Sequence, residues 1–271
     1  MSIFDSGLNP KYLEAIKKFR LIDDTFFNIC FDSSIECMQL LLCILFNRTD
    51  IIVQEVVTQF SAHHLYGRGV RFDVLAVDSD GKIYNVEIQR SDEGANPKRA
   101  RYNNCLIDSR EVAKGIKFKD FPEVWVIFIT ENDIFGAGLP VYHVERVITE
   151  LGKSFEDAAH IMYANGAYRA EDAIGFLMHD FFCADPTQMH YKELAKRTDF
   201  FKHEPKGVNA VCKIMQELMD EERIDWRNEG IDEANTRMAR EMLRDNEPMD
   251  KIVKYSHLPQ ERIEELAQQL R

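Results

Sequence analysis

The chain has 271 residues, of which 45% are hydrophobic and 30% charged, a composition typical of a globular protein with one large domain or two small ones. Its formal net charge of −12 excludes nucleic-acid binding through the overall electrostatic field, so a contact with phosphate requires a local basic patch. The most apolar run, residues 38–46, is too short to span a bilayer, and the first residues lack the pattern of a signal peptide. We therefore expect a cytoplasmic protein without a membrane partner.

The first half of the chain predicts a leading helical part followed by three strands, a helix and a strand. Hydrophobic patterns and helix-boundary residues give helices at 10–20 and 34–47, strands at 52–60 and twice within 70–90, a loop at 63–69, a helix at 96–115 and a strand at 121–133. A strand–helix–strand step requires a crossover and at least one parallel pair, so we expect a mixed sheet.

The second half is predicted to be mostly helical. It contains two weaker strands at 141–147 and 160–166, then helices at 170–182, 188–201, 207–225 and 229–245, and two short helices within 248–270. The charged stretch 220–230 is the best candidate for a domain boundary. We expect a domain at 1–225, with a core at about 20–135 and an extension at 136–225, and a helical tail at 226–271.

The turn within residues 70–90 decides which side chains share a face of the sheet. A two-residue loop would put Asp73 and Glu87 on opposite faces, whereas the three-residue loop 79–81 puts them directly opposite each other. The alternation of residues favours the longer loop, because it collects apolar side chains on one face and polar ones on the other. Gly81 suits the left-handed conformation that this loop requires. We therefore expect the Cβ atoms of the two acids to lie about 5 Å apart.

Two carboxylates at this distance on a half-buried face repel each other unless a proton or a cation lies between them. Oxygen ligands favour Mg²⁺ or Mn²⁺ over zinc. The segment 90–119 that follows has eight basic and four acidic residues, and a basic helix beside such a pair suits phosphodiester cleavage. The alternative for both features is a solvent-exposed surface, a polar strip on the strands and a solvated face on the helix.

An ordered set of stretches in this chain resembles the PD-(D/E)XK nuclease family transposases, also called recombination-promoting nucleases. The resemblance covers about residues 20–270 and is carried by RFDVLAVDSDGKIYNVEIQR, RARYNNCLIDS, IFITENDIFGAGLPVYHVER, IMYANGAY, GFLMHDFFCADPTQMHYKELAKRTDFFK and GVNAVCKIMQEL. It implies an α/β (α+β) fold: a restriction-endonuclease-like core with a mixed central sheet in αβββαβ order and a mostly helical C-terminal half. It also implies a metal-dependent DNA endonuclease of recombination or transposition, with Mg²⁺ as cofactor and Mn²⁺ as the alternative.

The resemblance also implies roles for individual residues. Asp73 and Glu87 correspond to the metal-binding carboxylates, and Gln89 takes the place of the Lys of the wider PD-(D/E)XK superfamily, a position where relatives of this family often show Gln. Glu36 corresponds to an additional acid of the leading helix, with Asp32 as the alternative. The residues expected to contact DNA are Arg71, Arg90, Lys98, Arg99, Arg101 and Tyr102.

Gln89 keeps a second interpretation open. Glutamine offers an amide dipole where lysine offers a charge, which leaves the activation of water to the metal or to a Lys or Arg from elsewhere. The alternative is a catalytically inactive nuclease-fold protein that binds DNA or protein.

Two further features are open to interpretation. The His-Asp pair within 179–186 is interpreted as structural, because no nucleophile is assigned near it. From residue 247 onward there are five acids and four bases, so a packing or homo-oligomerising tail is favoured over a DNA-reading helix-turn-helix.

Overall fold

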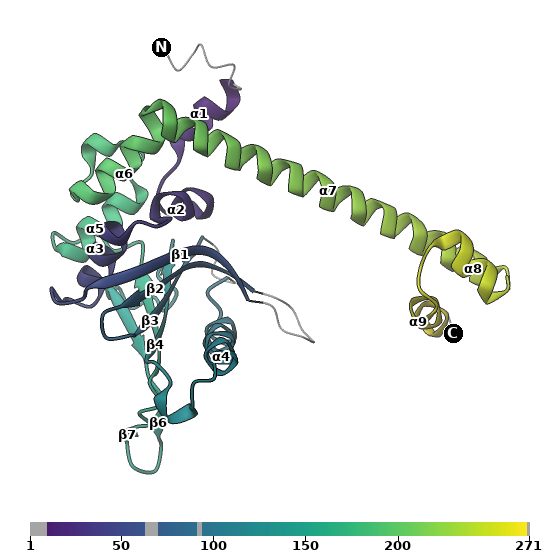
Figure 1. The fold of residues 1–271 in the computed structure, drawn as a ribbon, viewed down its shortest axis with the longest axis horizontal. Helices are drawn as coiled ribbons and strands as arrows, with labels where there is room; N and C mark the ends of the chain where they lie inside the picture. The colour runs from purple at the N-terminus through teal and green to yellow at the C-terminus, as the bar shows by residue number, and fades with distance from the viewer. Residues whose placement is uncertain (1–9, 63–69, 91–93, 270–271) are drawn as a thin grey trace. The chain divides into compact units, whose positions relative to one another are not determined.

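The computed structural model describes residues 10–62, 70–90 and 94–269, with the side chains of 59–62, 70, 71, 113 and 221–230 left out (Figure 1). The predicted loop at 63–69 lies outside the described residues. The chain divides into two compact units, 1–211 and 212–271, and each is described by itself.

A six-stranded mixed sheet forms the centre of the first unit. Its strands, in spatial order, are β1 (Val53–Ala62), β2 (Val70–Asp78), β3 (Ile83–Gln89), β4 (Val124–Thr130), β8 (Ala159–Asn165) and β5 (Val141–Val144). The first three are antiparallel, β3, β4 and β8 are parallel, and β5 is antiparallel to β8. A separate hairpin pairs β6 (Val147–Ile148) with β7 (Lys153–Ser154). The predicted mixed sheet in αβββαβ order is confirmed.

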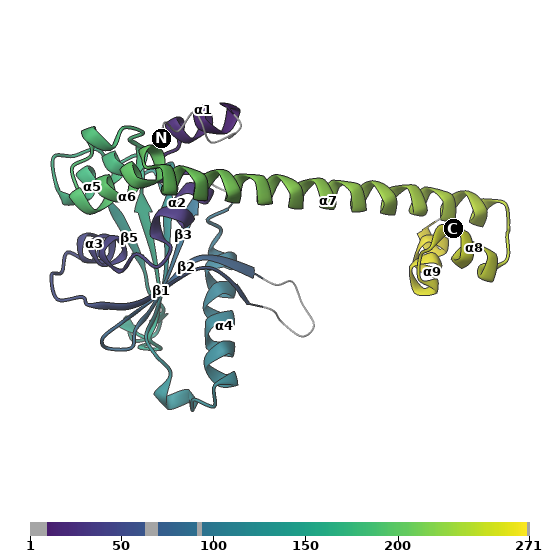
Figure 2. The same cartoon turned by 45° about the horizontal axis from the view of Figure 1, so that its top comes forward.

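Helices cover both faces of this sheet (Figures 1 and 2). On one face lies α4 (Pro97–Ala113); on the other lie α2 (Asp24–Phe31), α3 (Ile35–Leu45), α5 (Ala173–Phe182) and α6 (Lys192–His203), with α1 (Pro10–Lys18) preceding them. The helices that complete the chain are α7 (Pro205–Arg244), α8 (Met249–Ser256) and α9 (Gln260–Gln269), and short 3-10 turns lie at Phe118–Asp120 and Pro186–Gln188.

The apolar residues of the strands and helices meet in two layers, one on each face of the sheet. Beneath α4, Leu106 and Ile107 pack against Leu75 and Ile83 of the hairpin. Val112, later on the same helix, is 47% exposed and lies at the surface. On the other face, α2 and α3 contribute long apolar side chains that are almost fully buried, which at roughly 25 cal/mol per Å² of apolar surface makes this layer a main source of stability.

Two basic side chains of α6 fix the helical layer around α2. The guanidinium of Arg197 donates to the carbonyl oxygens of Cys30 and Asp32 at 2.9 and 2.7 Å, which caps the C-terminal end of α2. The ammonium of Lys202 donates to the carbonyl oxygen of Phe19 at 2.6 Å, and burial lowers its pKa. These bonds satisfy carbonyl groups that no helix ladder reaches, so they hold α2 in one position over the sheet.

One prediction of helix boundaries is wrong. The helices predicted at 207–225 and 229–245 form one continuous helix, α7, of 40 residues. The charged stretch between them consists mainly of good helix formers, and the single Gly230 costs only about 1 kcal/mol in a helix. Charge alone therefore did not end the helix.

The second unit packs the C-terminal part of α7 with α8 and α9 around Ala239, Ile252, Leu258, Ile263 and Leu266. His257, in the left-handed conformation (φ 57°), ends α8, and the predicted pair of short helices around Pro259 is confirmed. As for membranes, the described part of the chain contains no single helix long and apolar enough to cross one; α2 and α3 reach that length and composition only as a pair bent by 112°.

Candidate active site

The hairpin of β2 and β3 has the three-residue turn that the sequence predicts. The pairs Val74–Val86 and Val77–Ile83 define the register, and continuing it by one residue sets Asp73 opposite Glu87. Gly81 closes the turn with φ 79°, and its amide donates to the carbonyl oxygen of Asp78 at 3.0 Å. Because side chains alternate strictly along a strand, this turn places both carboxylates on the face that α4 covers.

Each of the two acids accepts a hydrogen bond from a backbone amide of the neighbouring strand. The amide of Ile88 donates to Oδ2 of Asp73 at 2.9 Å, and the amide of Asp73 donates to Oε1 of Glu87 at 3.3 Å. Glu87 is fully buried and Asp73 partly so. The alternative of a solvent-exposed polar strip is therefore wrong for this pair.

Burial and repulsion both act on the protonation of the pair. Desolvation, followed by repulsion from Glu87, raises the pKa of Asp73 to about 7. Desolvation also raises the pKa of Glu87, against the opposing effects of Asn85 and Arg99. Near neutral pH the pair therefore holds a proton, or it needs a cation in the proton's place.

Two residues of α2 extend the site toward Asp73. The side chain of Asn28 donates a hydrogen bond to Asp73, and its own Oδ1 is buried without a hydrogen-bond partner among the described residues. Asp24, one turn earlier, lies close enough to raise the pKa of Asp73 further, and the pKa of Asp24 is itself raised by desolvation. Sequence reasoning missed both residues because it predicted no helix at 24–31.

A guanidinium from α4 pairs with the buried acid. One terminal nitrogen of Arg99 lies 2.8 Å from Oε2 of Glu87, and the other donates to the carbonyl oxygen of Gly94 at 3.3 Å. Pro97 at the first position of α4 and Asn96, which caps the amide of Lys98, fix the start of this helix. The basic helix thus delivers one of its predicted residues directly to the carboxylate pair.

The other residues predicted to contact DNA lie at different distances from the pair. Lys98, Arg101 and Tyr102 are exposed on α4. Arg90 forms an ion pair at 3.1 Å with Asp23, the N-cap residue of α2, and another at 3.2 Å with Glu131, which follows β4. The side chain of Arg71 lies outside the described part of the structure.

Two further predicted site residues, Gln89 and Glu36, differ in burial. Gln89 is half-buried in the last position of β3, on the same face as Glu87, and its carbonyl oxygen accepts the amide of Glu131 at 3.0 Å. Glu36 is exposed in the first turn of α3, and its electrostatic effect within the described residues is on the thiol of Cys37. The structure therefore places Gln89 on the face of the sheet that carries the carboxylate pair, whereas the exposed Glu36 has no described contact with the pair.

Asparagine side chains bind the carboxylate oxygen of Glu87 that Arg99 does not contact. Nδ2 of Asn85 donates to Oε1 of Glu87 at 2.8 Å, and Nδ2 of Asn103 on α4 donates to Oδ1 of Asn85 at 3.0 Å. All three side chains are fully buried. This relay fixes the rotamer of Glu87 and leaves Oε2 for a cationic partner.

The asparagine relay gives a testable expectation about metal affinity. Asn103→Leu should weaken divalent-cation binding about 10-fold or more, because Asn85 loses the group that orients it toward Glu87. Calorimetric titration of the variant with Mg²⁺ measures the change. Asn104→Leu is the matched control, since this neighbouring side chain is also buried but neither of its amide atoms has a hydrogen-bond partner among the described residues. Equal loss in both variants would contradict a specific role for the relay.

The residues at the pair fit a divalent cation of the magnesium type. Two carboxylates with raised pKa lie opposite each other. Asn28, which donates a hydrogen bond to Asp73, has an amide oxygen without a hydrogen-bond partner in the described part of the chain. Arg99 already occupies one oxygen of Glu87 with a positive charge. All of these potential ligands are oxygens, which is the donor set that Mg²⁺ and Mn²⁺ prefer.

Comparison with known proteins supports the resemblance found in the sequence. Residues 36–165 match the model of a family described as PD-(D/E)XK nuclease family transposase, which confirms the resemblance over this segment. The six-stranded mixed sheet agrees with the restriction-endonuclease-like fold of that family, and the family indicates a nuclease-type function with DNA as substrate. Nucleases of this kind typically use divalent metals. Neither the curated proteins nor the solved structures contain a match to this chain.

Proposed function

We propose that this chain, with its PD-(D/E)XK nuclease family transposase segment at residues 36–165, is a Mg²⁺-dependent DNA endonuclease that acts in recombination or transposition. The observation that supports this most is the carboxylate pair. Asp73 and Glu87 come from neighbouring strands, point to one face, lie at least partly buried and both have a raised pKa. A buried acidic pair costs stability unless a cation or proton balances it, so its presence favours a functional explanation.

Each residue of the site has a chemical task in this proposal. Asp73 and Glu87 would hold the cation, which when bound supplies Lewis-acid activation of water and balances charge on the phosphate. Arg99 shares Oε2 of Glu87, so a bound cation would compete with it and free its guanidinium for a phosphate oxygen. Gln89 can orient water through its amide but cannot take a proton from it.

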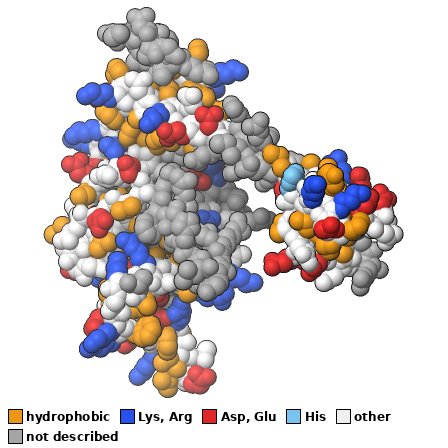
Figure 3. Space-filling view, turned by 45° about the vertical axis from the view of Figure 1, so that its right-hand side comes forward, with side chains coloured by type: hydrophobic (Ala, Val, Ile, Leu, Met, Phe, Trp, Pro, Cys, Tyr) orange, Lys and Arg blue, Asp and Glu red, His pale blue; other side chains and the backbone are white. Residues whose placement is uncertain are grey.

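The exposed residues of α4 give DNA a local place to bind. Lys98 and Arg101 follow Pro97 on the same helix that carries Arg99, so they can meet phosphates on either side of the scissile one. On the face drawn in Figure 3, Lys and Arg side chains are spread among acidic and apolar ones. With a net charge of −12, binding would depend on this short basic stretch and would be sensitive to salt.

A plasmid-nicking assay tests the proposal. Supercoiled DNA is incubated with the purified protein in Mg²⁺, in Mn²⁺ and in EDTA, at low salt and pH 8. The proposal expects nicked or linear DNA with either metal and none in EDTA. The second candidate, an inactive DNA-binding protein, is favoured by Gln89 at the position of the PD-(D/E)XK superfamily's lysine. Retarded but intact DNA under all three conditions would support that candidate and contradict the first.

A further inference from the structure

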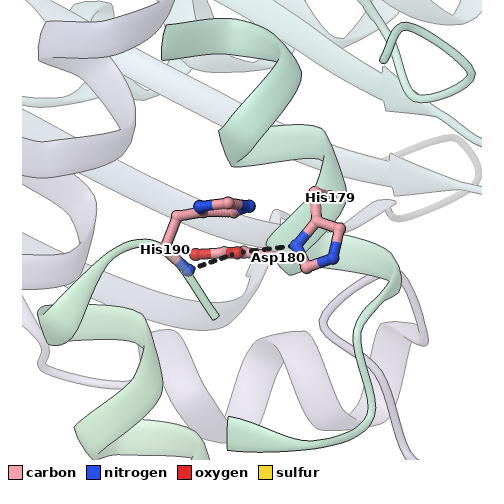
Figure 4. Close-up of side chains that lie close together, drawn as sticks. All are labelled: His179, Asp180 and His190. Atoms are coloured by element: carbon pink, nitrogen blue, oxygen red, sulfur yellow. Dashed lines mark hydrogen bonds and ion pairs between the residues drawn. The ribbon is translucent and has the colours of Figure 1, made fainter. Parts of the chain in front are cut away.

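Two histidines and a carboxylate meet at a second place in the first unit, in the helical layer. His179 and Asp180 lie in the last turn of α5, and His190 lies in the segment that leads into α6 (Figure 4). Each residue offers one ligand atom, and these atoms all lie within 4.8 Å of one another. Figure 4 shows the ring of His190 over the carboxylate of Asp180, with His179 beside it.

The carboxylate of this cluster is fully buried and positioned from outside its own helix. The amide of His190 donates to Oδ1 of Asp180 and the amide of Tyr191 to Oδ2, each at 2.8 Å. Nδ1 of His179 lies 3.1 Å from Oδ1. Among the ion pairs found for the described residues, this imidazole is the partner of Asp180, and the two backbone amides donate to the same buried carboxylate.

The two imidazoles are held in place by ring contacts. The ring of His190 stacks on Phe176 at 4.4 Å between centroids and meets His179 edge-on at 4.7 Å. A metal ion would use a lone pair from each of the three groups, whose ligand atoms already lie within 4.8 Å of one another.

The ligand types and distances fit zinc. Zinc binds imidazole nitrogen and carboxylate oxygen at about 2.0–2.2 Å, which requires ligand atoms roughly 3–4 Å apart. The pair at 3.1 Å already meets this requirement, and the ligand atom of the exposed His190 lies within 4.8 Å of both. Nitrogen ligands distinguish this cluster from the oxygen-only pair at Asp73 and Glu87, which suits a harder cation.

We propose that His179, Asp180 and His190 form a zinc site that fastens the end of α5 to the segment before α6. The three side chains supply three of four ligands, and water from the exposed side of His190 supplies the fourth. The site is independent of the nuclease chemistry, since none of its residues belongs to the carboxylate pair. Its role is to stabilise the helical layer that also holds α2.

Zinc binding to the full chain tests this site. The protein is dialysed against EDTA, then titrated with Zn²⁺ alone, and bound metal is counted by elemental analysis after gel filtration. We expect one tightly bound ion per chain, a thermal midpoint that rises on its addition, and at least a 30-fold loss of affinity in His190→Gln. This variant keeps the backbone amide that bonds Asp180, so the fold is preserved.

Two control variants make the result specific. His203→Gln removes an exposed histidine that contacts Asp199 at 2.7 Å without a second imidazole among its described contacts, and it should bind zinc like the unmodified protein. Asp73→Asn removes an acid of the other cation site, and the tightly bound zinc that His190→Gln loses should remain in this variant. Absence of a bound ion, or equal binding by His190→Gln, would overturn the proposal; the latter result would locate the zinc on other ligands such as the free thiols.

Discussion

Asp73→Asn and Glu87→Gln each remove Mg²⁺-dependent nicking, with a loss of about 10²–10³-fold or more, while the protein remains folded. Each change removes one negative charge from the pair and keeps the size of the side chain. The asparagine at 73 can still accept the amide of Ile88, so the hairpin register is retained. Initial rates of plasmid nicking at saturating Mg²⁺, with circular dichroism as the check on folding, measure the effect.

Two other substitutions serve as controls, because they change acids that lie away from the carboxylate pair. Asp80→Asn changes an exposed acid in the turn of the same hairpin and should leave the rate unchanged. Glu36→Gln tests the additional acid implied by the family resemblance, and its exposed position leads us to expect nearly full activity. Unreduced nicking by Asp73→Asn would remove that acid from the mechanism.

Asp73→Asn also makes the metal-free protein more stable at pH 8, by up to ~4 kcal/mol, with little change at pH 4. In the folded protein the pKa of Asp73 is raised to about 7 from an ordinary value of 3.8, chiefly by desolvation and then by Glu87. Between these values the folded state binds the proton that the unfolded state has released. The stability of the unmodified protein therefore falls as pH rises through this window and is lowest above pH 7. There Asp73 is a buried charge, which the Asp73→Asn variant lacks.

Thermal unfolding in EDTA at a series of pH values measures this effect. We expect the midpoint of the variant to exceed that of the unmodified protein by about 10 °C at pH 8 and to converge with it near pH 4. Saturating Mg²⁺ should reverse the order at pH 8, because the cation stabilises only the protein with both acids. A variant that is less stable than the unmodified protein at pH 8 without metal would show that the acid is structural.

The part of the site that lies on the hairpin could be predicted from the sequence because strand geometry is strict. Side chains alternate with a period of two, so the alternation of residues and Gly81 together fixed the register that sets Asp73 opposite Glu87. The basic helix was predicted at 96–115 from its helix-boundary residues, and Arg99 within it reaches the pair. These inferences depend on local rules, and the structure follows them.

The rest of the site depends on how separate elements pack, which local patterns do not encode. Asn28 reaches Asp73 because α2 is held over the sheet by Arg197 of α6, more than 160 residues later in the chain. Asn103 is an ordinary polar residue of α4 in the sequence, yet in the fold it lies fully buried against Asn85. Such residues become visible only when the facing layers are known.

Direct titration with Mn²⁺ tests most closely whether Asp73 and Glu87 share a divalent cation. Electron paramagnetic resonance counts free and bound Mn²⁺ at pH 8, and the His190→Gln background keeps the histidine cluster from contributing. We predict at least one Mn²⁺ bound per chain, displaced by Mg²⁺ and lost in both Asp73→Asn and Glu87→Gln. Mn²⁺ binding that is equally strong in those two variants would contradict the account.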